Sequence, residues 1–98
     1  MVSELGQGML DCADDIAEFL KRGDINAAAE NALFWLPLEE HTPTITWHCR
    51  LLLRDKRIFA KQEELWSVMR SMISEEDRKR LDVATLRAIG WYVVDLAE

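Results

Sequence analysis

Apolar residues recur every three or four positions through most of this 98-residue chain, the spacing of one face of an α-helix. In the first segment, from about Glu4 to Arg22, they are Leu5, Met9, Cys12, Ile16, Phe19 and Leu20. Acidic residues occupy the other side of the segment: Glu4, Asp11, Asp15 and Glu18. The pattern predicts an amphipathic helix with an acidic polar face.

Gly23 and Asp24 predict a tight turn after this helix. Glycine adopts the left-handed backbone that ends a helix, and aspartate caps the next helix by accepting from its free N–H groups. The second helix is expected from Ile25 to Leu36, where Pro37 ends it. Ala28 and Ala32 are small enough for two helices to approach closely, so the two segments are predicted to form an α-hairpin.

The same period continues in the second half of the chain. Thr42 as N-cap and Pro43 at the first helical position predict a third helix that ends near Arg54. Asp55 is expected to cap a fourth helix. Its apolar positions are Ile58, Phe59, Leu65, Trp66, Met69, Met72 and Ile73. Ser74 and Asp77 form a capping-box pattern, and Asp82 is a second candidate cap.

The last segment carries more apolar residues than one helix stripe can bury. Leu86, Ile89, Val93 and Leu96 share one face, which is expected to point to the core. Trp91 and Val94 then point elsewhere, as apolar residues of an interface do. Residues 91–94 have strand propensity, but with no partner strand in the chain a helix is expected.

These elements predict one all-α domain over residues 1–98, with four to five helices arranged as two antiparallel α-hairpins plus a C-terminal closing helix. Hydrophobic residues make up 49% of the chain and charged residues 31%, as in folded globular proteins rather than disordered ones.

The net charge of −6 is unevenly distributed. Residues 1–49 hold nine acids and two bases, which gives −7, and residues 50–98 hold nine acids and ten bases, which gives +1. The acidic first half argues against nucleic acid or an anionic membrane as partner. With no basic leader, no long apolar run and only two unpaired cysteines, a cytoplasmic protein is expected.

His48 and Cys49 are the residues most suggestive of catalysis. Consecutive helical residues point about 100° apart, so a catalytic couple is not expected. The favoured interpretation is a buried Cys49 beside a half-exposed His48. A zinc site built from Cys12, His41, His48 and Cys49 lacks the paired spacings of structural zinc sites. The chain is therefore predicted to be no enzyme and to bind no metal or cofactor.

One basic cluster interrupts the acidic character of the chain: Arg50, Arg54, Lys56, Arg57 and Lys61. A DNA-reading helix would carry such residues, but these straddle a predicted turn. A solvated hairpin end, paired with Glu63, Glu64 or the first helix, is the favoured interpretation.

A weak internal repeat relates the two predicted hairpins. Ala28 and Ala60 are equivalent at an offset of 60 − 28 = 32 residues, close to the period of about 34 of tetratricopeptide repeats. Residues 20–28, with Gly23 at the turn, resemble the middle of such a repeat, although the second turn lacks glycine and Pro37 comes early. In size and layout the chain resembles the small chaperones that hold needle subunits in type III secretion. That resemblance implies a groove that takes a partner's amphipathic helix.

The sequence therefore predicts a chaperone or adaptor that binds a helical partner protein, and it leaves a homodimer open. The predicted partner-binding residues are Trp91, Val94, Asp11, Asp15 and Glu18. The alternative is a small acidic inhibitor, phage-encoded or immunity-type, that blocks a basic surface of a target enzyme.

Overall fold

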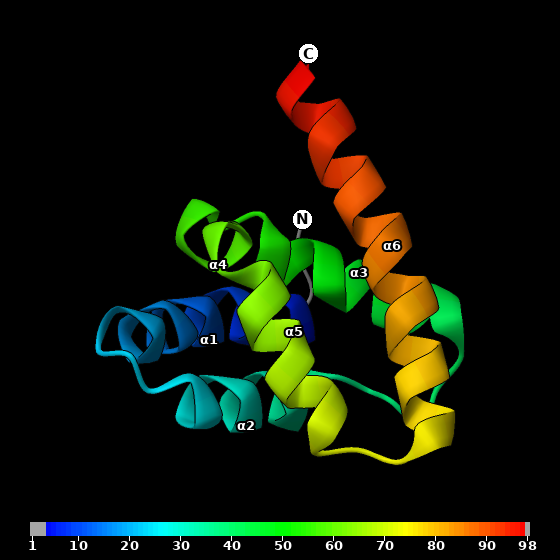
Figure 1. Cartoon of the computed structure of the whole chain (residues 1–98). Helices are drawn as coiled ribbons and strands as arrows, with labels where there is room; N and C mark the ends of the chain where they lie inside the picture. Colours follow the sequence, from blue (N-terminus) through cyan, green and yellow to red (C-terminus); the bar gives the residue numbers. More distant parts are fainter. Residues whose placement is uncertain (1–3, 98) are drawn as a thin grey trace.

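The computed structural model of the chain describes the backbone of residues 4–97 and the side chains of residue 8 and residues 11–90. The regular structure of this part is entirely helical: α1 (Glu4–Lys21), α2 (Ile25–Trp35), α3 (Thr42–Leu53), α4 (Lys56–Ala60), α5 (Gln62–Ser71) and α6 (Glu75–Ala97) (Figure 1). The all-α prediction is confirmed. The predicted number of four to five helices is wrong, because residues 4–97 form six.

The turn between α1 and α2 forms as its sequence predicts. Gly23 has a φ of 81°, and two backbone bonds close the end of α1: Asp24 N–H to Phe19 C=O at 2.9 Å and Gly23 N–H to Leu20 C=O at 3.1 Å. The Asp24 side chain then accepts from Ala27 N–H at 3.2 Å and caps α2. Thus two adjacent residues end one helix and begin the next.

Small residues bring α1 and α2 together along their length. Ala28, Ala29 and Ala32 are completely buried in α2. At the other end of the pair, a Cβ added to Gly8 would lie 3.0 Å from the Trp35 ring. Glycine suits this position because the indole lies close to the α1 backbone and any Cβ would press on the ring.

The predicted fourth helix breaks into two at Lys61, whose φ of −112° and ψ of 14° leave the helical region. Buried Ile58 of α4 packs beside α1 and α3, whereas buried Leu65, Trp66 and Met69 belong to α5, which packs on α2. One straight helix cannot reach both sets of neighbours, so the chain bends between them.

The central helix is α3, which is buried on nearly all sides. Its buried residues are Ile45, Thr46, His48, Cys49, Leu51, Leu52 and Leu53. Among the described residues, α3 packs most extensively against α6, and α1 against α2. The predicted arrangement of two hairpins is not confirmed, because α6 rather than the segment after Asp55 is the main neighbour of α3. Helix α3 also begins one residue earlier than predicted, with His41 at the cap position.

Helix α6 runs for 23 residues without interruption, including residues 91–94 with their strand propensity. Ser74 accepts from Asp77 N–H at 3.2 Å at its start, as the capping pattern predicts. The second cap predicted at Asp82 is wrong, because Asp82 lies inside the helix and pairs with Arg70 at 2.8 Å. The C-terminal part of α6 extends beyond the other helices (Figure 1).

Candidate functional site

The acidic face of α1 lies at the surface. Asp11, Asp15 and Glu18, spaced by four and three residues, are all exposed and share one side of the helix. Glu18 makes one 3.5 Å contact, with Arg22 a turn later, in which both side chains are more than half exposed. An exposed pair of this kind contributes little to stability.

The neighbouring acid, Asp14, instead pairs with a residue of another helix. The Arg57 guanidinium donates to Asp14 at 2.8 Å and to Asp55 at 2.6 Å, which ties α1 to the start of α4. Asp55 also caps α4 by accepting from Arg57 N–H at 2.9 Å. Hydrogen bonds from Arg57 lower the pKa of Asp55. The predicted pairing of the basic cluster with the first helix is confirmed for Arg57.

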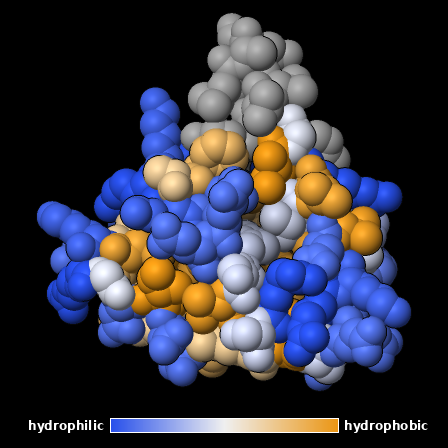
Figure 2. Space-filling model, in the orientation of Figure 1, coloured by the Kyte–Doolittle hydropathy of each residue, from blue (hydrophilic) through white to orange (hydrophobic). Residues whose placement is uncertain are grey.

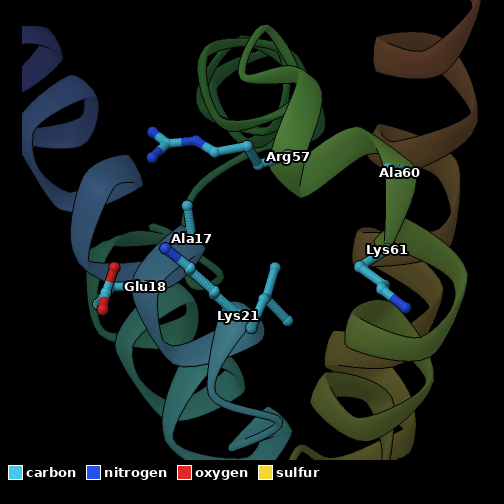
Figure 3. Close-up of a pocket in the computed structure, with 7 residues that line it drawn as sticks. Ala17, Glu18, Lys21, Arg57, Ala60 and Lys61 are labelled. Atoms are coloured by element: carbon cyan, nitrogen blue, oxygen red, sulfur yellow. The ribbon is translucent and has the colours of Figure 1, made fainter.

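A cavity of about 310 Å³ lies between the end of α1 and α4, lined by Ala17, Glu18, Leu20, Lys21, Arg57, Ala60 and Lys61. Its cations do not converge on one point: Arg57 points toward α1 and Lys61 points away from Arg57 (Figure 3). Arg57 is already held by two carboxylates. The geometry gives no cradle for an anion in this cavity.

A second cavity, of about 360 Å³, lies between α5 and α6 and is more suited to an apolar group. Trp66 and Leu86 line it, together with Thr85, and the Arg70–Asp82 ion pair of 2.8 Å borders it. Trp66 is 5% exposed, and its indole Nε1 has no hydrogen-bond partner among the described residues. We call this cavity the α5/α6 groove.

Leu86 corrects the face assigned to the last helix. It is 73% exposed rather than directed at the core, and Val83 is 44% exposed on the same side. The core face of α6 consists of Leu81, Ala84 and Ala88, with Thr85 beside them. Ile89 is half-buried and packs against this core, as predicted. The predicted binding residues Trp91 and Val94 have side chains outside the described part, so their positions stay predictions. The sequence analysis missed the exposure of Leu86 and Val83 because it assigned the core face from the larger apolar residues. The small residues Ala84 and Ala88 mark the core face more correctly.

His48 and Cys49 both point into the protein. His48 is 2% exposed rather than half-exposed, with Nδ1 2.9 Å from the Thr44 carbonyl oxygen. Burial raises the pKa of the Cys49 thiol to about 12, and burial with the Asp15 charge raises that of Cys12 to about 11. Neither thiol is activated as a nucleophile, because the thiolate is the reactive form.

Among the described residues, no three metal-ligating side chains gather into a candidate metal site. No helix formed by those residues has the length and apolarity needed to span a bilayer. Comparisons with protein-family models, with characterised proteins and with solved structures find no match for this chain.

Proposed function

We propose that this protein is a non-catalytic protein-binding domain, a chaperone or adaptor, which takes an amphipathic helix of another protein on the surface made by α5 and α6. The α5/α6 groove carries this proposal, because it combines an apolar lining with an exposed leucine at its edge. Helical partners commonly insert apolar anchors at one-turn spacing into such grooves.

The groove has features of an interface hot spot, the small group of residues that contributes most of the binding free energy. Leu86 offers apolar area that the isolated chain leaves in water, and the nearly buried Trp66 beside it forms part of the groove wall. The Arg70–Asp82 pair supplies polar groups at the border, as the rim of an interface does. The sequence-predicted contacts Trp91 and Val94 lie further along the same helix, so α6 would extend the surface.

Amphipathic helical peptides selected against the intact protein from a random library test this proposal. A peptide that occupies the groove is expected to shift the indole N–H signal of Trp66 and the methyl signals of Thr85 and Leu86 in NMR spectra. Leu86→Gln should weaken its binding by about tenfold or more, since burying a leucine contributes about 1.5–3 kcal/mol.

Phe34→Gln is the matched control, because Phe34 is 80% exposed on α2 and is not among the residues that line the groove. This variant should bind the peptide as the wild type does. Trp91→Ala tests the extension along α6 and should also weaken binding. Selected peptides that leave Trp66, Thr85 and Leu86 unperturbed would place the binding surface elsewhere.

The acidic face of α1 supports a second candidate, a small inhibitor that covers a basic surface of an enzyme. Asp11, Asp15 and Glu18 are exposed together, and the first half of the chain carries the negative net charge. Charge complementarity of this kind steers a basic partner and sets specificity. Binding through this face would fall with added salt, whereas binding in the apolar groove would change little.

A further inference from the structure

Another cavity adjoins the α5/α6 groove, between the end of α5 and the start of α6. Ser67, Arg70, Ser71 and Arg78 line this cavity of about 360 Å³, and we call it the arginine notch. Two of these four residues are cationic and none is acidic, although the whole chain has a net charge of −6. In Figure 2, hydrophilic residues surround the lower part of α6, where the helix begins, and hydrophobic residues reach the surface beside its upper part. The lining of the notch favours an anion.

Arg78 is held in place without a carboxylate partner. Its Nε donates to the Arg70 carbonyl oxygen at 2.7 Å, which is its only hydrogen bond within the described part of the chain. By contrast, Arg57 and Arg80 each pair with two carboxylates. The half-buried Arg78 side chain thus presents two Nη groups that are free to donate. Two parallel N–H groups of this kind match the two oxygens of a carboxylate.

The other groups of the notch are compatible with a bound anion. The Ser67 hydroxyl makes no hydrogen bond to the described residues, so it can donate to a ligand. The last carbonyl groups of a helix carry partial negative charge and would repel an anion. In α5, however, the Val68 carbonyl accepts from the Ser71 hydroxyl at 2.6 Å, and the Arg70 carbonyl accepts from Arg78. Two of these carbonyl groups therefore already have donors.

The notch and the groove form one continuous surface, because Arg70 lines both. On α6, Arg78, Asp82 and Leu86 follow one another at intervals of four residues and so lie on one side of the helix. The eight residues from Arg78 to Leu86 correspond to about 12 Å along the helix axis. A partner helix that lies along α6 and packs an apolar side chain on Leu86 therefore passes Arg78 about two turns away.

We propose that the arginine notch binds a carboxylate of the partner helix, from an Asp or Glu seven or eight residues away from the apolar side chain that packs on Leu86. This inference rests on the proposed function, because the same helix occupies the groove. The carboxylate accepts from the two Nη groups of Arg78, and the Arg70–Asp82 ion pair between the two contacts stays intact. An apolar contact alone would let the partner slide, whereas the added charge pair fixes its register.

A double-mutant cycle between Arg78 and the acid of the peptide tests the inference. The probe is a library-selected peptide that shifts the Trp66 and Leu86 signals, compared with the same peptide in which the acid at this spacing is replaced by its amide. The replacement should weaken binding to the wild type by about fivefold, as expected for a partly exposed charge pair. It should not weaken binding to Arg78→Gln. Isothermal titration calorimetry measures the four dissociation constants.

Arg87→Gln is the matched control. Arg87 is an exposed arginine of α6 that lines neither the notch nor the groove, so this variant changes the net charge by the same amount. With it, the amide peptide should still bind about fivefold more weakly than the acid peptide. Arg78→Lys keeps the charge but not the paired donors, so it should retain only part of the difference. Circular dichroism and melting temperature establish that each variant is folded.

Three results would overturn the inference, and they differ in what they imply for the proposed function. If groove-binding peptides carry no acid at this spacing, or if acid and amide bind the wild type equally well, the notch takes no carboxylate and the groove proposal stands. If inorganic phosphate shifts the Arg78 side-chain signals while the two peptides bind alike, the notch is a site for a free anion. If no selected peptide shifts the Trp66 and Leu86 signals, the proposed function fails and this inference fails with it.

Discussion

Small side chains set the distance between α1 and α2. Ala28 and Ala32 are completely buried, and Gly8 leaves only enough space for the Trp35 ring. Interiors are packed to nearly crystalline density, so an added group at such a place must displace its neighbours. A few small residues therefore determine how closely α1 and α2 pack.

Ala28→Leu is expected to lower the free energy of unfolding by about 1–3 kcal/mol, because three added heavy atoms overpack the contact between α1 and α2. Thermal or urea unfolding measures the effect. Ala60→Leu is the matched control, since Ala60 is exposed beside a cavity of about 310 Å³ and should change stability little. If Ala28→Leu changed the free energy of unfolding as little as Ala60→Leu does, the contact between α1 and α2 would accommodate the larger side chain without loss of stability.

Residues whose environment is fixed locally could be predicted from the sequence, and the others could not. Gly23 and Asp24 act through the backbone within five residues, and both were predicted correctly. His48 was assigned half-exposed because its own helix leaves that side open. It is buried in a helix that other helices cover on nearly all sides, and the main one, α6, lies more than 20 positions later, where no local pattern indicates its placement.

At the level of elements, tertiary packing decides where helices end. Lys61 breaks the predicted fourth helix although it is neither glycine nor proline, because α4 and α5 pack on different neighbours. Asp82 has the residue type of a cap, yet α6 continues through it, and its carboxylate pairs with Arg70 of α5 instead of capping a helix. The groove between α5 and α6 arises from these two outcomes, so the sequence alone could not locate it.

The Asp55 side chain both caps α4 and pairs with Arg57, the residue that links α4 to α1. Asp55→Ala removes the cap of α4 and one anchor of Arg57, and it is expected to cost about 1 kcal/mol or more. Asp55→Asn keeps an oxygen that can accept from Arg57 N–H, so it should cost less. Urea unfolding of the two variants at neutral pH separates capping from charge.

The pH dependence of Asp55 follows from the direction of its pKa shift. Its folded-state pKa lies below the ordinary value of 3.8, so the carboxylate stabilises the fold above that pH. The contribution is lost as the pH falls from about 4 through the folded-state value, where the carboxyl protonates. The stability difference between wild type and Asp55→Asn should shrink over that interval. A stability difference that is constant down to pH 2 would contradict a contribution from the charge of the Asp55 carboxylate.

For the whole molecule, the charges and the apolar surfaces are on different helices. Among the described residues, the acidic face belongs to α1, whereas the apolar groove belongs to α5 and α6. Apolar contacts hold a complex together, and long-range charge raises the rate at which a partner arrives. The two surfaces could therefore act in one binding event, with α1 attracting a basic partner that docks elsewhere.

Reversing Asp11, Asp15 and Glu18 to Lys should then slow association with a selected basic helical peptide by about tenfold at low salt, with little change in its dissociation rate. Stopped-flow measurements of Trp fluorescence report both rates. The matched control reverses Glu30, Glu39 and Glu40, which are also exposed, so both variants gain the same net charge. If the α1 face steers the peptide, the first variant should be slower than the control, and about 1 M salt should remove the difference because the screening length falls to about 3 Å. Equal slowing by both variants would assign the effect to net charge alone, and the face of α1 would have no special part in binding.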